Sequence, residues 1–105
     1  MKRITLGFIM SAVLGLAFSF AVAAGDVAKG KALFNDVHFA GGEAGVSCNS
    51  CHPGGQGLEQ AGSMENLEPM INKCIEGALK GKAIDVKSEE MSDIVAYIKS
   101  LQSQE

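Results

Sequence analysis

The feature that most constrains this chain is the five-residue segment Cys48-Asn49-Ser50-Cys51-His52. Two cysteines separated by two residues and followed directly by a histidine are the signature for attachment of a c-type haem. The spacing suits this chemistry because two vinyl groups on one porphyrin edge need two thiols a short arc apart. The adjacent histidine then lies under the ring, where a neutral imidazole binds iron. The motif predicts one covalent haem c at Cys48 and Cys51, with His52 as the proximal ligand.

The same two cysteines would also suit a redox dithiol or half of a zinc site. A thioredoxin-type dithiol requires a βαβ context, and the sequence shows no convincing strand. A zinc site requires further ligands at regular spacing, and only Cys74 and the lone loop residue His38 remain. A disulfide scaffold fits poorly because the chain has three cysteines, an odd number. Haem attachment is therefore the interpretation that the pattern favours, and we assign His38 no role.

The first 24 residues predict export from the cytoplasm, the compartment in which c-type haem is not attached. Two basic residues near the start precede an uncharged apolar run, which ends in Ala21-Val22-Ala23-Ala24. This order is that of a secretory signal peptide, and the small residues favour cleavage after Ala23 or Ala24. The alternative is an uncleaved membrane anchor, because the run approaches the ~20 residues that span a bilayer. We expect residues 1–24 to be the signal, residues 25–105 the mature domain, and the location to be periplasmic.

The mature domain is short and acidic. Residues 25–105 hold seven of the nine basic residues and all twelve acidic ones, so their net charge is about −5. This balance argues against nucleic-acid binding, which requires cations to displace the counterions of phosphate. A domain of this size buries only ~60% of its unfolded surface and often needs a metal, disulfide or cofactor. The chain has no Trp and one Tyr, so we expect something other than side chains to fill its core.

The spacing of apolar residues predicts an all-α domain with three main helices and long loops. The first helix is expected from Asp26, a good N-cap, to about Asp36. The third is expected to follow the cap Ser88, with two glutamates in the first turn, where the helix dipole favours negative charge. The apolar stripe of the third helix consists of Met91, Ile94, Val95, Ile98 and Leu101.

The second helix is predicted between these two. A start near residues 63–65 becomes firm only at about Glu68, because Pro69 is tolerated only in the first turn. The helix is expected to run to about Leu79, with Gly81 as its terminator. Its apolar stripe consists of Leu67, Met70, Ile71, Cys74, Ile75 and Ala78.

These features resemble the class I c-type cytochromes, which are monohaem proteins, over nearly all of the mature sequence. In that family a glycine and an aromatic residue of the first helix pack against an aliphatic-x-x-Tyr stretch of the last. Gly30 and Phe34 match the pair, and Ile94-Val95-Ala96-Tyr97 matches the stretch. A glycine also lets two helix backbones approach closely, and Phe34 can pack on Tyr97. The resemblance implies a cytochrome c-like fold around one haem and makes residues 25–105 a cytochrome c domain.

One departure from the family is the long, glycine-rich segment of residues 35–47. Phe34 lies 14 residues before Cys48, a wider gap than the family usually has. The sequence is compatible with three roles for this segment: a cover for a haem edge, part of a partner site, or a plain surface loop.

The sixth iron ligand is also missing from the place where the resemblance implies it. Class I cytochromes usually carry a methionine in the loop ahead of the last helix, but residues 77–87 contain none. Met91 would supply the thioether that is common in electron carriers, although it equally suits the core stripe. The distal candidates are Cys74 and Met91, followed by Met64, Met70 and the lysines of Lys80-Gly81-Lys82.

Cys74 is the leftover thiol of an exported chain and falls on the stripe of the second helix. Three stretches, 71–74, 79–82 and 88–91, are similar to a domain found among thiosulfate-oxidising cytochromes, and in some of those a cysteine placed this way binds the iron. A thiolate would push electron density onto iron and lower its potential, whereas a thioether favours the ferrous state. The alternative is that Cys74 is a small buried hydrophobic residue.

Together these patterns predict a periplasmic electron carrier rather than an enzyme. Apart from the haem ligands, the mature sequence has no obvious constellation for substrate chemistry. Its acidic surface suggests redox partners with a basic docking surface, and contact with a membrane is expected only if the signal stays uncleaved. The alternative is a catalytic or gas-sensing cytochrome, for example one that oxidises thiosulfate with a Cys-ligated haem.

Overall fold

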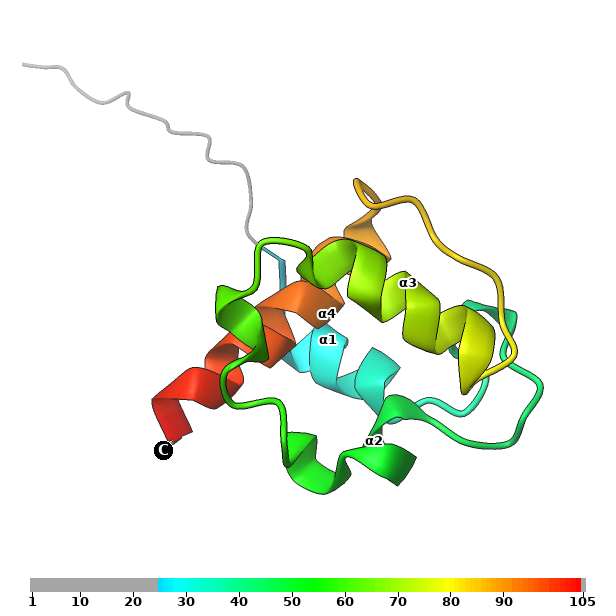
Figure 1. Cartoon of the computed structure of the whole chain (residues 1–105), viewed down its shortest axis with the longest axis horizontal. Coiled ribbons are helices and arrows are strands. Elements are labelled where there is room, and N and C mark those ends of the chain that lie inside the picture. Colours follow the sequence, from blue (N-terminus) through cyan, green and yellow to red (C-terminus); the bar gives the residue numbers. More distant parts are fainter. Residues whose placement is uncertain (1–24, 105) are drawn as a thin grey trace, which may run out of the picture.

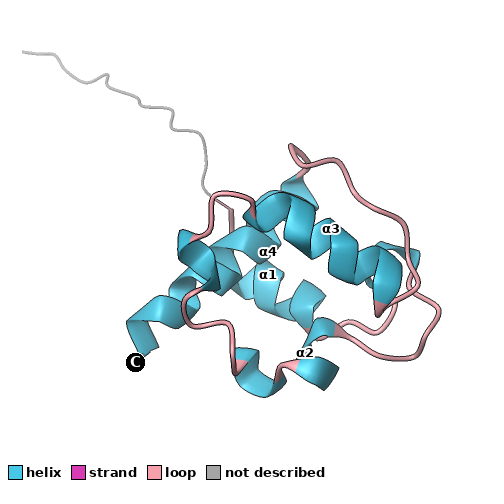
Figure 2. Cartoon of the chain, in the orientation of Figure 1, coloured by secondary structure: helices cyan, strands magenta, loops and turns pink. Residues whose placement is uncertain are grey.

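The computed structural model describes residues 25–104, so the predicted signal lies outside the described residues (Figure 1). Over this range helices and loops alternate and there is no strand (Figure 2). The α-helices are α1 (Val27–Phe34), α2 (Cys48–Cys51), α3 (Leu67–Gly77) and α4 (Glu89–Ser100). Short 3-10 helices are η2 (Phe39–Gly41), η3 (Pro53–Gly55), η4 (Ala61–Ser63) and η5 (Leu101–Gln104). The all-α prediction is confirmed, with α1, α3 and α4 as the three main helices.

Two of the main helices begin at the predicted caps. The Asp26 side chain accepts a hydrogen bond from the Lys29 N–H at 3.1 Å, at the start of α1. The Ser88 hydroxyl accepts one from the Met91 N–H at 3.2 Å, at the start of α4. Each bond satisfies a backbone donor that the first helical turn leaves without a partner.

Helix α3 ends differently from the prediction. Its last helical residue is Gly77 rather than Leu79, and Lys80, not Gly81, takes the left-handed conformation, with φ of 59°. The Gly81 N–H donates to the Ile75 carbonyl at 2.8 Å. A side chain at Gly81 would place its Cβ 2.7 Å from the Ala40 carbonyl oxygen. Glycine is therefore required there for close packing, not for an unusual dihedral angle.

The crossing of α1 and α4 is the scaffold of the domain (Figure 1). A Cβ atom at Gly30 would overlap the Asp93 carbonyl and lie 2.9 Å from Cβ of Tyr97. One helical turn later, the rings of Phe34 and Tyr97 pack with centroids 5.0 Å apart and planes inclined at 60°. The tilted geometry is one that aromatic pairs favour. The close approach that Gly30 suggested is confirmed.

The hydrophobic core gathers around this crossing. Asp93 is the buried carboxylate of the region, and it accepts a hydrogen bond from the Asp26 N–H at 2.8 Å, which ties the start of α1 to α4. Phe39 brings the glycine-rich segment into the core. The buried apolar residues are Phe34, Phe39, Leu67, Ile71, Ile75, Leu79, Met91, Ile94, Tyr97, Ile98 and Leu101. Among residues 25–104, no helix is both long enough and apolar enough to cross a bilayer.

The crossing can be tested with Gly30→Ala. We expect the holoprotein to lose about 1–3 kcal/mol of unfolding free energy, the usual effect of overpacking, because the methyl group meets the α4 backbone. Guanidinium denaturation would measure the loss. Gly77→Ala is the control, because a Cβ there meets nothing within 4 Å, and it should be neutral or slightly stabilising. Equal stability of the two variants would contradict the close crossing.

Candidate haem site

The Cys-x-x-Cys-His motif forms one helical turn, α2, preceded by the buried residue Ser47. The Ser47 N–H donates to the Ser50 hydroxyl at 2.9 Å, and the His52 N–H donates to the Cys48 carbonyl at 2.9 Å. These two bonds hold both ends of the turn. Residues three positions apart lie on one face of a helix, so Cys48 and Cys51 point to the same side.

A tight turn after the motif orients the His52 imidazole. Nδ1 of His52 lies 3.0 Å from the carbonyl oxygen of Gln56. A carbonyl oxygen only accepts hydrogen bonds, so Nδ1 is the protonated nitrogen and Nε2 keeps a free lone pair. Gly54, Gly55 and Gly57 make this turn with positive φ values of 63°, 84° and 91°. The role of the Gln56 carbonyl was not identified from the sequence, although the surrounding glycines indicate a turn.

The motif faces an apolar cavity of about 380 Å³, which falls within the roughly 300–1,000 Å³ of small-molecule and cofactor sites. Residues from α1, α2, α3 and α4 and from the loop after the motif surround it. The lining residues are Phe34, Ser47, Cys48, Cys51, His52, Leu58, Ala61, Met64, Leu67, Met70, Ile71, Cys74, Ala78, Leu79, Ile94 and Ile98. Two thiols, an imidazole and an otherwise apolar wall fit a porphyrin attached by thioethers and bound through iron.

The predicted stripe of α3 divides into two faces. Leu67, Ile71 and Ile75 are buried in the core, and Leu67 and Ile71 also line the cavity. The other three residues, Met70, Cys74 and Ala78, are exposed at the cavity and succeed one another every four positions. Apolar residues repeated at this spacing are normally covered by a partner. The second face of α3 is therefore available to an apolar group bound in the cavity.

The Cys48 thiol lies in an environment that disfavours its charge. Burial raises its pKa to about 11, and the nearby Cys74 thiol contributes to the rise. A buried thiolate would lose hydration that the cavity does not replace. The Cys48 thiol therefore stays protonated at neutral pH, and a thioether formed there would be neutral as well.

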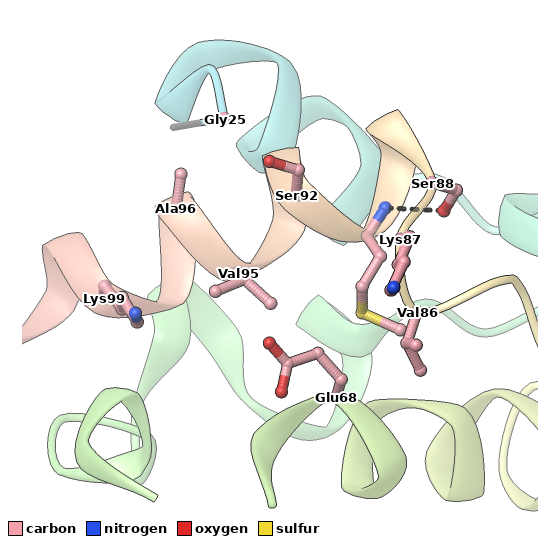
Figure 3. Close-up of a pocket in the computed structure, with 10 residues that line it drawn as sticks. Gly25, Glu68, Val86, Lys87, Ser88, Ser92, Val95, Ala96 and Lys99 are labelled. Carbon is pink, nitrogen blue, oxygen red and sulfur yellow. Dashed lines mark hydrogen bonds between the residues drawn. The ribbon is translucent and has the colours of Figure 1, made fainter. Parts of the chain in front are cut away.

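The structure places the candidates for the distal iron ligand in different parts of the molecule. Cys74, Met64 and Met70 line the cavity. Met91 is only 1% exposed and belongs to the core. It lines a different hollow of about 340 Å³, where Glu68 of α3 and Val95 of α4 lie on facing sides (Figure 3). Of the other residues considered from the sequence, Lys80, Lys82 and His38 are absent from the cavity lining.

The comparisons with known proteins identify the family to which the chain belongs. The model of the SoxA/TsdA cytochrome c domain family matches residues 29–105, and the chain belongs to that family. The predicted resemblance to class I c-type cytochromes and to domains of thiosulfate-oxidising cytochromes is thereby confirmed. Membership implies covalently bound haem c, iron and electron transfer, and domains of this type are typically periplasmic. Comparisons with curated proteins and with solved structures gave no match.

The cavity makes folding depend on the cofactor. Residues 25–105 produced in the cytoplasm without the leader should stay haem-free and largely unfolded, because the uncovered face of α3 leaves too little buried apolar surface to offset chain entropy. Far-ultraviolet circular dichroism would show a helical signal well below that of the exported holoprotein. A haem-free chain with the helicity and cooperative melting of the holoprotein would contradict this dependence.

Proposed function

We propose that this protein is a periplasmic electron carrier with one haem c, attached at Cys48 and Cys51 and held on its proximal side by His52. The observation that carries the proposal is a single apolar cavity containing both thiols and an imidazole whose Nε2 is free. The sequence contains one Cys-x-x-Cys-His motif, which supports one haem. When bound, this group supplies reversible one-electron chemistry between ferric and ferrous iron. The chain sets its ligands, its surroundings and its access to partners.

Cys74 is our choice for the distal side. It approaches the cavity from α3, whereas His52 belongs to the segment after α2, so the two side chains come from different walls. Met91 is the weaker candidate because it packs in the core and borders a separate hollow. A thiolate at this position would stabilise ferric iron and give a low reduction potential. Such a carrier would suit donors of low potential.

The remaining features of the proposal concern export and partners. Residues 1–24 act as a cleaved signal peptide, which delivers the chain to the compartment where c-type haem is attached. The acidic mature domain meets redox partners through basic docking surfaces, because opposite charges steer transient encounters. No nucleic acid is involved.

Thiosulfate oxidation is the second candidate function. It is favoured by membership of the SoxA/TsdA domain family together with the exposed Cys74 thiol at the cavity. Incubation of the ferric holoprotein with thiosulfate separates the two functions. Rapid reduction of the haem, with turnover once an excess of a one-electron acceptor is added, would support catalysis, whereas a slow reaction without turnover would support the simple carrier. Rapid binding of carbon monoxide by the ferrous protein would instead favour a gas-sensing role.

The distal assignment predicts different results for three substitutions. Cys74→Ser should abolish the thiolate signal in the ferric paramagnetic-resonance spectrum. Cys74→Met should raise the reduction potential by on the order of 0.1 V or more, within the roughly 0.8 V that axial ligands control. Met91→Leu conserves volume and should leave both measurements unchanged. Loss of the native spectrum in Met91→Leu, with Cys74→Ser unaltered, would reverse the assignment.

The docking proposal predicts a dependence on salt. Electron transfer to a small basic redox protein should slow as ionic strength rises, because the Debye length shrinks to about 8 Å at 0.15 M. A small acidic protein of similar potential is the control, and its rate should be lower and rise with salt. Stopped-flow spectroscopy would measure both rates. Faster transfer to the acidic partner at low salt would count against a basic docking surface.

A further inference from the structure

The glycine-rich segment that sets this chain apart is fastened to the end of α3 by backbone hydrogen bonds. The N–H groups of Glu43 and Ala44 both donate to the Leu79 carbonyl, at 3.0 and 3.1 Å. The Lys82 N–H donates to the Ala40 carbonyl at 2.9 Å. We call these two paired stretches, residues 39–44 and 79–82, the clasp. Because all three bonds join main-chain atoms, the clasp fixes the path of both stretches independently of most of their side chains.

The clasp is packed too closely to accept extra atoms. A Cβ at Gly42 would lie 2.9 Å from the Leu79 carbonyl oxygen, and one at Gly81 would lie 2.7 Å from the Ala40 carbonyl oxygen. The two stretches also contain Ala40 and Lys80, non-glycine residues with φ of 56° and 59°. Residues with side chains seldom adopt this region, and they keep it only where surrounding contacts hold them.

The clasp connects walls of the cavity that are distant in sequence. The segment of residues 35–47 begins after Phe34 and ends at Ser47, and both of these residues line the cavity. Leu79, to which the segment is fastened, is 2% exposed and lines the cavity as well. In Figure 1, α2 and α3 lie on different sides of the domain, with the loop of residues 35–47 running to α2. The fastening of this loop is therefore one of the contacts that hold α3 relative to the attachment turn, together with the helix's buried core face and the Asn72–Ile84 hydrogen bonds.

We propose that the clasp sets the gap between α2 and α3 and thereby positions Cys74 for the distal side of the haem. Gly42 and Gly81 are positioning residues, because neither lines the cavity and both permit the contact that fixes the end of α3. This inference rests on the proposed function, in which Cys74 binds the iron opposite His52. It gives the long glycine-rich segment a role in holding the distal ligand in place.

The test uses the exported holoprotein with Gly42→Ala, Gly81→Ala and the double substitution. Each adds a methyl group where the structure leaves no room, and the double variant opens the clasp if one group alone is absorbed. Gly77→Ala is the control for a methyl group on the same helix in open space. Ser88→Ala is the control for lost stability, since it removes the α4 cap far from the clasp.

Three measurements report separately on the clasp, on the distal ligand and on access to the distal side. Amide hydrogen exchange at Glu43 and Ala44 shows whether the clasp has opened. The ferric paramagnetic-resonance spectrum gives the fraction of thiolate-ligated haem, and the rate of carbon monoxide binding to the ferrous protein shows how readily the distal side opens. We expect the clasp variants to keep their covalent haem, exchange these amides faster, lose part of the thiolate signal and bind carbon monoxide several-fold faster. Gly77→Ala should match the wild type in all three, and Ser88→Ala should match it in the thiolate signal and in the rate of carbon monoxide binding.

The outcomes separate this inference from the proposed function. A wild-type protein without haem, or without a thiolate signal, would overturn the proposed ligation and the clasp's role with it. A wild-type thiolate signal that persists unchanged in the double variant, despite faster exchange at residues 43 and 44, would overturn the clasp alone. Equal loss of the signal in Ser88→Ala would also overturn it, because general destabilisation would then explain the effect.

Discussion

The structure depends on an apolar cavity that the side chains do not fill. Helix α3 has one buried apolar face, of which Leu67 and Ile71 border this cavity, and a second, exposed face with Met70 and Cys74, which borders it as well. Covering an apolar side chain contributes about 1.5–3 kcal/mol, whereas a whole domain is stable by only 5–15 kcal/mol. A group that fills the cavity therefore decides whether so short a chain folds. The cofactor site is therefore also part of the core of the fold. This explains how a domain without Trp and with one Tyr can be stable.

The site is assembled from parts with separate supports. The α1–α4 crossing needs only the missing side chain at Gly30 and the packing of Phe34 on Tyr97. The attachment turn is held by its own backbone bonds, and the Gln56 carbonyl selects the His52 nitrogen that remains free. The distal wall is formed by α3, whose Asn72 side chain makes two hydrogen bonds with the Ile84 backbone. The end of α3 is also fastened to residues 39–44 by backbone hydrogen bonds.

The sequence predicted what is governed by neighbours along the chain. The caps Asp26 and Ser88, the helix crossing at Gly30 and the helical fold follow from local chemistry or from a specific pattern, and the structure has them. The sequence did not show how residues that are distant along the chain lie relative to one another. The single apolar stripe predicted for α3 is two faces in the structure. Periodicity shows which residues share a side of a helix but not what covers them. Gly81 does bond to the end of α3 through its N–H and the Ile75 carbonyl, but a side chain is excluded there by contact with Ala40, a residue about 40 positions away.

The distal ligand illustrates the same limit. Cys74 and Met91 each suit a core stripe by spacing, and only the packing of α3 against α4 places one at the cavity and the other away from it. The assignment of a distal ligand presupposes that residues 48 to 52 hold a porphyrin. Intact-mass spectrometry of the exported protein tests this claim most directly. The account predicts a single species with the mass of the chain after signal cleavage plus one haem. A species with the bare chain mass, from cells that mature other c-type cytochromes, would contradict it.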